Sequence, residues 1–353
     1  MPLHPLHGHT ALRKRLASAI AADRLPPVIL LEGPRGVGKQ RLALWVAQRL
    51  ACEAPTPEGE PCGACRPCHL VLGLAHPDVH WFVPVEPSKK SADADKQVEL
   101  AEEAIGEVLA ARRERSLYGP PGGMASHSMA AIRLLLRRQA LTPALGGPRV
   151  FILGDAERLI AQTGLHDASN ALLKALEEPP RRTWFILTAA DGSRLLPTIL
   201  SRVVRMRVPR VADSVVTAFI QSLPPTERRG VVPAEAAAGA EGCIGRVLAA
   251  ERVAGGDGAA ERFLRAARGT PVQRYAAALS QPPYEARGGF SQMLDGLMAR
   301  LRREAAVGGD TARLVEAIAQ VLEARAAAQG NVNPQLLAAV LIGDLAEPQG
   351  VGA

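Results

Sequence analysis

The chain has 353 residues, of which 47% are apolar and 3% aromatic, and its 42 basic and 35 acidic residues give a formal net charge of +7. It contains no run of about 18 apolar residues that would span a membrane, and we expect no signal peptide because its start lacks an uninterrupted apolar segment. The few aromatic side chains argue against a base-stacking surface, and charge alone is weak support for nucleic-acid binding. The length predicts about two or three domains in a cytoplasmic protein.

The segment 28–40 reads VILLEGPRGVGKQ and has the pattern of a phosphate-binding loop. Its first residues form an apolar run that predicts a buried strand, and apolar residues at helical spacing after Lys39 predict a helix. Glycines between the two let successive backbone N–H groups face a phosphate, which Lys39 can also reach. The predicted nucleotide contacts in this loop are Gly33, Arg35, Gly36, Gly38, Lys39 and Gln40. The alternative is a glycine-rich turn that only joins a strand to a helix.

Position 40 departs from the usual pattern of such loops. A Ser or Thr hydroxyl there normally binds the Mg²⁺ ion that bridges the β- and γ-phosphates. The longer amide of Gln40 cannot occupy the same place. We therefore expect weak or absent binding of ATP and ADP, and a loop that is poorly equipped for hydrolysis.

Four of the five cysteines are clustered with the spacing C-x9-C-x2-C-x2-C, and they are Cys52, Cys62, Cys65 and Cys68. In a cytosolic protein such a cluster indicates a metal site rather than disulfides. Four thiolates make a closed, tetrahedral site for a structural Zn²⁺ ion. His69, His76 or His80 could replace one thiolate, although packing or surface roles are favoured for each. Cys243 stands alone and is interpreted as a small apolar residue.

Residues 86–128 interrupt the apolar pattern with charged runs, glycine and proline, and we expect an exposed insertion, part helix and part loop. After it, helical patterns at 129–136 and 170–176 alternate with apolar runs at 150–153 and 184–187. Strands that alternate with helices predict a parallel sheet that is covered by helices on both faces.

Beyond Pro209 the sequence changes to alanine-rich helical segments that are separated by Pro and Gly breaks. The predicted fold class is therefore α/β plus all-α. We predict an α/β domain over 1–209 with a zinc-binding insertion at 52–68, a small helical domain over 210–256 and a larger helical domain over 257–353.

Two further segments, NALLKALEEPP at 170–180 and FILTAADGSRLLPTILSR at 185–202, resemble the subunits of the bacterial DNA polymerase III clamp loader, an AAA+ assembly. The cysteine cluster follows the loop helix as it does in that family, and QGNVNPQLL at 329–337 is similar to its collar domain. The resemblance implies a P-loop AAA+ domain, a helical lid and a collar. This family contains ATP-hydrolysing motor subunits and a stator subunit, delta-prime, whose nucleotide motifs are degenerate.

The residues after the strand at 150–153 depart from the motor pattern. A motor subunit has Asp-Glu there, one acid for Mg²⁺ and one to activate water. Gly154 and Asp155 stand at that pair, so the metal-side carboxylate is missing and Asp155 is one methylene shorter than glutamate. The polar sensor expected after the next strand falls on Ala189 or Ala190, with Thr188 adjacent but out of phase.

The lid segment GCIGRVL, 242–248, departs as well. The position that resembles the sensor arginine is Gly245, and Arg246 follows one residue later, which turns its side chain by about 100° on a helix. Together with Gln40, these departures imply that no ATP hydrolysis takes place in this chain. No polymerase activity is expected of the chain itself either, although the complex it would join is a DNA-directed DNA polymerase.

The pair Ser201-Arg202 retains the family pattern, with Val203 in place of cysteine. The resemblance implies that Arg202 acts in trans as an arginine finger, because a guanidinium presents a fork of donors to phosphate oxygens. The alternative is a surface salt bridge. Among the other basic residues, we considered DNA contacts for Arg137, Arg138, Arg181 and Arg182, but solvated or interface roles are favoured.

The leading hypothesis is therefore a non-catalytic stator of the delta-prime type that supplies Arg202 to a neighbouring ATPase. The resemblance implies partners: the gamma/tau motor subunits, the delta subunit and, through the complex, the sliding clamp and primed DNA, with no membrane. One alternative is an active motor subunit of the same loader. The other is a zinc-containing nucleic-acid-binding module that keeps the loop as scaffold.

Overall fold

The computed structural model of this chain describes residues 3–86, 93–114, 117–119, 121, 125–159, 167–225, 227–228, 232–282, 289–306, 308, 310–328 and 332–346. The chain forms two compact units, residues 1–248 and 249–353, and each is described by itself. No helix in the described part of the chain is long and apolar enough to cross a membrane.

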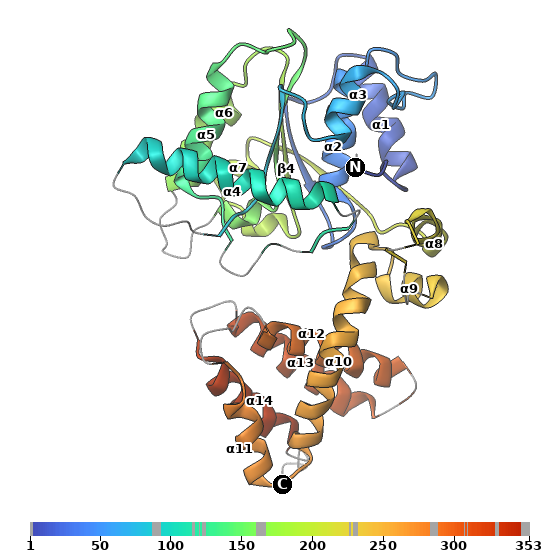
Figure 1. The fold of residues 1–353 in the computed structure, drawn as a ribbon, viewed down its shortest axis with the longest axis vertical. Coiled ribbons are helices and arrows are strands. Elements are labelled where there is room, and N and C mark those ends of the chain that lie inside the picture. Colours follow the sequence, from blue (N-terminus) through green and yellow to red (C-terminus); the bar gives the residue numbers. More distant parts are fainter. Residues whose placement is uncertain are drawn as a thin grey trace. The chain divides into compact units, whose positions relative to one another are not determined.

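Unit 1 is built around a parallel sheet of five strands (Figure 1). From edge to edge the order is β2 (Val79–Phe82), β3 (Arg149–Leu153), β4 (Thr183–Ala189), β1 (Val28–Glu32) and β5 (Val204–Arg207). The three inner strands are almost wholly buried, as runs of Val, Ile, Leu and Phe require in a sheet covered on both faces. The predicted parallel sheet is confirmed. The two edge strands are short and were not predicted.

Helices cover both faces of this sheet. In Figure 1, α1, α2 and α3 lie to one side of the sheet and α5 and α6 to the other. The helices of this part are α1 (Thr10–Ala21), α2 (Lys39–Ala51), α3 (Arg66–Leu72), α4 (Ala94–Glu114), α5 (Met129–Ala140), α6 (Asp167–Glu177) and α7 (Pro197–Leu200), with 3-10 turns η1 (Ala156–Leu159) and η2 (Gly192–Arg194).

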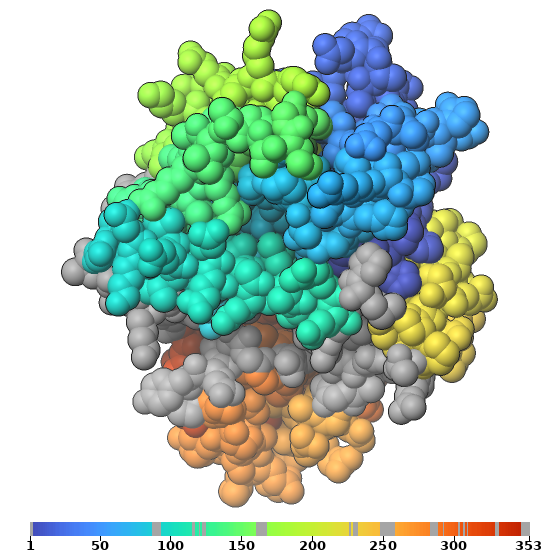
Figure 2. Space-filling view, turned by 45° about the horizontal axis from the view of Figure 1, so that its top comes forward, coloured from blue at the N-terminus to red at the C-terminus, as the bar shows by residue number. Residues whose placement is uncertain are grey.

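The segment 86–128 differs from the expected exposed insertion. Its helix α4 lies across one face of unit 1, beside α5 (Figure 2). Val98, Ala101 and Ile105 are buried in the main core, and Arg112 is only 4% exposed. The expected helix is present, and most of its residues are exposed or half-buried. The expectation of exposure is wrong for the stripe of apolar residues three and four apart that packs into the core, and for Arg112. Residues 87–92, 115–116, 120 and 122–124 of this segment lie outside the described part.

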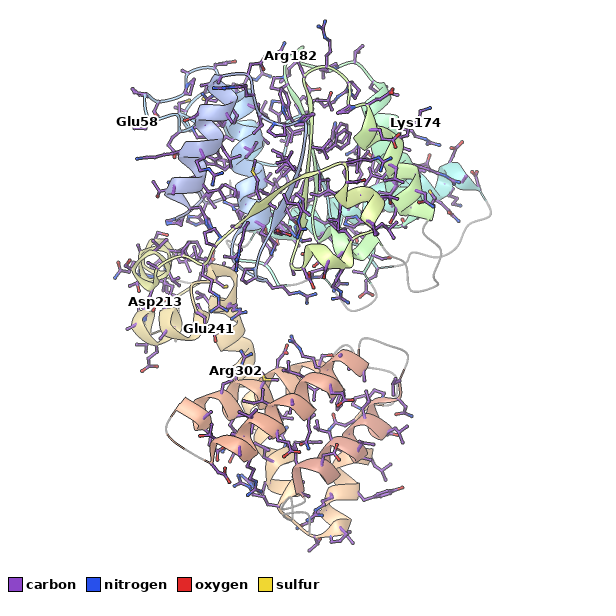
Figure 3. The ribbon with its side chains drawn as sticks, turned by 180° about the vertical axis from the view of Figure 1, so that it is seen from behind. Glu58, Lys174, Arg182, Asp213, Glu241 and Arg302 are labelled. Atoms are coloured by element: carbon purple, nitrogen blue, oxygen red, sulfur yellow. The ribbon has the colours of Figure 1, made fainter. Side chains whose placement is uncertain are left out.

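The end of unit 1 is a small helical group with its own core. It contains α8 (Asp213–Ser222), α9 (Pro233–Ala240) and the turn η3 (Ile244–Arg246). Val216, Phe219 and Ile220 are buried at its centre. Asp213 and Glu241, labelled in Figure 3, mark the start of α8 and the residue after α9.

Unit 2 is all helical. Its core includes Phe290, Leu294, Leu297 and Val321, which are fully buried. The helices are α10 (Val247–Ala267), α11 (Pro271–Leu279), α12 (Gly289–Ala306), α13 (Thr311–Ala327) and α14 (Pro334–Ala346). The predicted all-α part is confirmed. The division between the units falls after Leu248, within the first turn of α10, and part of the collar-like segment 329–337 lies outside the described residues.

Candidate functional site

The predicted phosphate-binding loop joins β1 to α2, in the strand, loop and helix order that the sequence indicates. Gly36 and Gly38 have φ angles of 80° and 104°, which L side chains rarely adopt. Gly33 is constrained by space as well, because a Cβ there would lie 2.4 Å from the backbone oxygen of Val208. The loop therefore follows a path that requires glycine at these positions.

Lys39 begins α2, and its side chain is buried in the loop itself. Its Nζ donates to the carbonyl oxygen of Gly33 at 2.8 Å and to that of Pro34 at 2.9 Å. Burial lowers the pKa of the Lys39 ammonium, and the carboxylates of Asp155 and Glu157 oppose that shift. Two of the three donors of this ammonium are thus committed to the loop backbone.

Gln40 connects the loop to the end of β3 and to α4. Its Nε2 donates to Oδ2 of Asp155 at 2.9 Å, and its Oε1 accepts from Nη1 of Arg112 at 2.8 Å. A Cβ on Gly154 would lie 2.9 Å from the amide carbon and nitrogen of Gln40. Gln40 and Gly154, the two residues that differ from the motor pattern, therefore lie next to each other. The amide of Gln40 occupies the space that a side chain at position 154 would fill.

Asp155 stands at a tight corner after β3. Its φ is 50°, and its backbone N–H donates to Oγ1 of the buried Thr188 at 3.0 Å. The ring of His127 lies against the same corner, with Nε2 2.7 Å from the carbonyl oxygen of Gly154. The side chain of Thr188, in β4, therefore bonds to this corner. Ala189, where a polar sensor was expected, has no polar side-chain group.

Glu157 is a member of the site that sequence reasoning missed. Its Oε1 accepts from the backbone N–H of Ala190 at 3.1 Å, and its buried Oε2 has no hydrogen-bond partner among the described residues. Burial raises the pKa of Glu157, and the negative charge of Asp155 raises it further. The sequence does show an acidic residue two positions after Asp155, which could have indicated a second carboxylate near the loop.

The lid segment contacts the loop through its backbone. The N–H of Gly245 donates to the carbonyl oxygen of Gly36 at 2.8 Å, and a Cβ on Gly245 would lie 2.8 Å from the Cα of Gly36. The guanidinium of Arg246 is paired with Glu241 at 2.7 Å. In this arrangement position 245 has no room for an arginine side chain, and Arg246 is engaged within the lid.

Arg202 follows α7 and lies just before β5. Its Nε donates to Oε1 of Glu177 at 2.8 Å, and its Nη1 donates to the carbonyl oxygen of Thr198 at 2.7 Å and to Oγ of Ser201 at 3.1 Å. The side chain remains 31% exposed. Ser201 itself donates to the carbonyl oxygen of Thr198 at 3.0 Å.

Arg202 lies at the opposite end of the strands from the phosphate-binding loop. Val204 pairs with Ile29 in parallel register, so Arg202 precedes the start of β5, whereas Gly33 follows the end of β1. The four residue-to-residue steps from Ile29 to Gly33 advance by about 13 Å along a strand. Arg202 is thus separated from the loop of its own chain by the length of the strands.

The four clustered cysteines come together at the end of α2 and the start of α3. Their Sγ atoms all lie within 4.8 Å of one another. Cys52 follows α2, Cys68 lies in α3, and Cys62 and Cys65 lie in the loop between them. The backbone N–H of Cys62 points at Sγ of Cys52, and that of Cys65 at Sγ of Cys62, both at 3.3 Å. The cluster can hold a metal ion.

The donor set and its surroundings suit a closed thiolate site. Tetrahedral zinc with Zn–S bonds of about 2.3 Å places its sulfur atoms about 3.8 Å apart, and Cys62 and Cys68 lie 4.0 Å apart. Backbone N–H groups from Cys65 and Ala64 lower the pKa of Cys62 to about 6, whereas burial raises the pKa of Cys68. Nδ1 of His76 is occupied by the N–H of Asp78, which agrees with its predicted packing role.

Three of the four other arginines that were considered for DNA contact, Arg137, Arg138 and Arg182, have side-chain partners within the chain. Arg137 is paired with Asp95 and Arg138 with Glu102, so both connect α5 to α4. Arg182, labelled in Figure 3, donates to the carbonyl oxygen of Gly146 at 3.3 Å. Arg137 and Arg138 therefore have a structural role between two helices of the chain.

A family model described as DNA polymerase III, delta subunit matches residues 8–212, which is more than half of the chain. The chain belongs to this family. The matched range contains the phosphate-binding loop, the cysteine cluster and Arg202. The resemblance that was predicted from segments 170–180 and 185–202 is confirmed.

Two relatives and one solved structure illustrate the similarity. The DNA polymerase III subunit delta' of Pseudomonas aeruginosa is 34% identical over 180 residues, 51% of this chain and 42% of the relative. The subunit gamma/tau of Mycobacterium tuberculosis is 29% identical over 195 residues, 55% of this chain and 26% of the relative. A DNA polymerase III gamma subunit-related protein from Thermotoga maritima aligns with 96% of this chain and 99% of its own, at 16% identity and a TM-score of 0.37. The chain spans less than half the length of these two curated relatives.

Proposed function

We propose that this chain is a non-catalytic subunit, of the delta-prime type, of a DNA polymerase III clamp loader. In this role it joins gamma/tau and delta subunits in the cytoplasm and, through the complex, helps to load the sliding clamp onto primed DNA. Membership of the delta subunit family and the delta' relatives support the assignment. The domains in this proposal are an AAA+ domain over 1–209, a lid over 210–256 and a collar over 257–353, and three separate hydrophobic cores support that division.

The observation that carries the proposal is the position of Arg202 at the end of the strands opposite its own loop. A guanidinium that is partly exposed there cannot serve the nucleotide site of its own chain, but it can reach a nucleotide held by an adjacent subunit. Such an arginine stabilises the charge that develops on the transferred phosphoryl group. We therefore assign Arg202, supported by Ser201, as the trans-acting finger.

The nucleotide loop of this chain is proposed to be inactive. Gln40 and Gly154 remove the hydroxyl and the carboxylate that hold Mg²⁺, and Lys39 is bonded to its own loop. Any ATP or ADP bound to Gly33, Arg35, Gly36 and Gly38 would be held weakly without these magnesium-binding groups. The gamma/tau relative favours a motor subunit as the second candidate, but a motor requires the groups that these positions lack.

The cysteine cluster is proposed to bind one structural Zn²⁺ ion. Cys52, Cys62, Cys65 and Cys68 would supply four thiolates and leave no open position for a substrate. The ion would tie the end of α2 to the start of α3 and so hold the insertion 52–68 in place. Its role is therefore in folding and not in catalysis.

Reconstitution tests this function. Purified gamma/tau and delta subunits from the same organism are assembled without the chain, with the wild-type chain or with Arg202→Ala, and DNA-stimulated ATP hydrolysis and clamp loading are measured. We expect Arg202→Ala to assemble normally and to slow hydrolysis by about tenfold or more at the neighbouring site. The matched control is Arg194→Ala, which removes an exposed arginine from η2. Equal rates for wild type and Arg202→Ala would contradict the finger, and clamp loading that is independent of the chain would contradict membership of the loader.

A further inference from the structure

A positively charged side chain approaches the place where a phosphate-binding loop normally meets magnesium. In such loops the ion lies between the hydroxyl at position 40 and an acid that follows the Walker B strand. Here Nη1 of Arg112 donates to Oε1 of Gln40, and Nε2 of the same amide donates to Asp155. The three side chains form one continuous chain of hydrogen bonds from cation to anion.

Arg112 is built into this position and does not reach it by chance from the surface. Its side chain is buried, and its guanidinium lies 4.6 Å from the ring centre of Trp81 and 4.2 Å from that of Tyr118. Aromatic faces stabilise a desolvated guanidinium. Burial lowers the pKa of Arg112, and the negative charge of Asp155 opposes this effect. Because a guanidinium keeps its proton in proteins, a permanent positive charge lies beside the loop.

The neighbouring glycine fits the same arrangement. A Cβ at Gly154 would come within 2.9 Å of the Gln40 amide, so a carboxylate at 154 and the glutamine at 40 exclude each other unless one of them moves. The change from an acid to glycine at position 154 and the change from a hydroxyl to an amide at position 40 therefore depend on each other. Magnesium does not fit these residues.

We propose that Arg112 is an internal cation that takes the place of magnesium in this site, neutralising Asp155 through the amide of Gln40. The guanidinium, the amide and the carboxylate hold α4, α2 and the end of β3 together in a metal-free form. The inference rests on contacts within the α/β domain and is independent of the clamp-loader assignment. It also gives a structural role to α4.

A thermodynamic cycle tests the proposed charge coupling. All three tryptophans, Trp45, Trp81 and Trp184, lie in unit 1, so their fluorescence follows the unfolding of this unit in the full chain. We expect Arg112→Met to lower the unfolding midpoint by about 5–15 °C, since it removes the buried donor to Gln40 and one of the cations near the half-buried carboxylate of Asp155. In an Asp155→Asn background the same change should cost less than half as much. Arg113→Met, at the exposed neighbour on α4, is the control and should change little in either background.

Equal midpoint shifts for Arg112→Met in both backgrounds would overturn the proposal and leave Arg112 as a packing residue. If Arg112→Met fails to fold, Gly154→Ala gives an independent cycle. It should lower the midpoint more in the wild-type chain than in Gln40→Ser, and equal shifts would refute the exclusion between positions 40 and 154.

Magnesium gives the direct test of the replaced ion. The midpoint of the wild-type chain is measured with ATP alone and with ATP plus MgCl₂, at matched ionic strength. We expect the same midpoint in both, whatever the affinity for ATP, because the guanidinium already occupies the place of the ion. A higher midpoint with magnesium and ATP together than with ATP alone would show a working magnesium site and overturn the proposal.

Discussion

Glu177 binds the guanidinium of Arg202 through a single carboxylate oxygen. Nε and Nη2 of Arg202 both donate to Oε1 of Glu177, while Nη1 bonds to Thr198 and Ser201. Glu177 is the last residue of α6, so the end of one helix and the turn after another fix the orientation of the proposed finger. This orientation is set within the chain, before any partner is present.

The first prediction concerns this pair. Glu177→Gln should change the free energy of unfolding by less than about 1 kcal/mol, because the pair is partly exposed. It should nevertheless reduce DNA-stimulated ATP hydrolysis by the assembled loader, since Arg202 loses the carboxylate that orients it. The matched control is Glu178→Gln, which removes the adjacent exposed carboxylate. Identical loader activity for the two variants would show that Glu177 does not position Arg202.

The second prediction concerns ATP turnover by the isolated chain. No magnesium-dependent hydrolysis is expected, because Gln40 and Gly154 replace the magnesium-binding groups and Lys39 is bonded to Gly33 and Pro34. A steady-state phosphate-release assay on the wild-type chain and on Lys39→Ala should give the same background rate. Turnover that disappears in Lys39→Ala would support the motor alternative.

Much of the α/β domain was predictable because its information is local. The apolar runs at 28–31, 150–153 and 184–187 each became an inner strand, since a strand buried on both faces must be apolar throughout. The cysteines were equally informative, because a metal ion needs several thiolates at short spacing. The edge strands β2 and β5 were missed because VHWF and VRMR are short and carry polar residues.

The parts of the site that could not be predicted depend on contacts between distant segments. Arg112 is one of many charged residues on α4, and only its place between Trp81 and Tyr118 distinguishes it. Glu157, on the η1 turn after β3, accepts from the N–H of Ala190, and Thr188, in β4, accepts from that of Asp155. Both contacts depend on the register of β3 and β4. A single sequence does not contain that register. The magnesium-binding groups that are missing at positions 40 and 154 could therefore be predicted, but the contacts of Arg112, Glu157 and Thr188 could not.

The third prediction is a loss of stability in acid that is traced to His127. Burial lowers the pKa of this imidazole to about 4, from an ordinary value of 6.5. Between these values the unfolded chain binds a proton that the folded chain does not, so the free energy of unfolding falls as the pH is lowered from 6.5 to 4. The histidine contributes about 3 kcal/mol to this fall.

His127→Gln, which keeps a donor for the carbonyl of Gly154, should therefore lose less stability over this range than the wild-type chain. Denaturant unfolding at a series of pH values gives the comparison, and His4→Gln is the control for removing a less buried histidine. Parallel pH profiles for wild type and His127→Gln would exclude the buried imidazole as the source.

The last prediction concerns the metal content of the chain. We expect about one zinc ion per chain, bound by Cys52, Cys62, Cys65 and Cys68. Metal analysis of protein purified under reducing, chelator-free conditions measures the content directly. Cys65→Ser should lower both the zinc content and the unfolding midpoint, because a structural ion contributes its binding free energy to folding. Cys243→Ser is the matched control, since this thiol is buried outside the cluster and its loss should leave the metal content unchanged. Less than about half an equivalent of zinc in the wild-type chain, or a Cys65→Ser variant with unchanged metal and stability, would mean that the four thiols pack together without an ion.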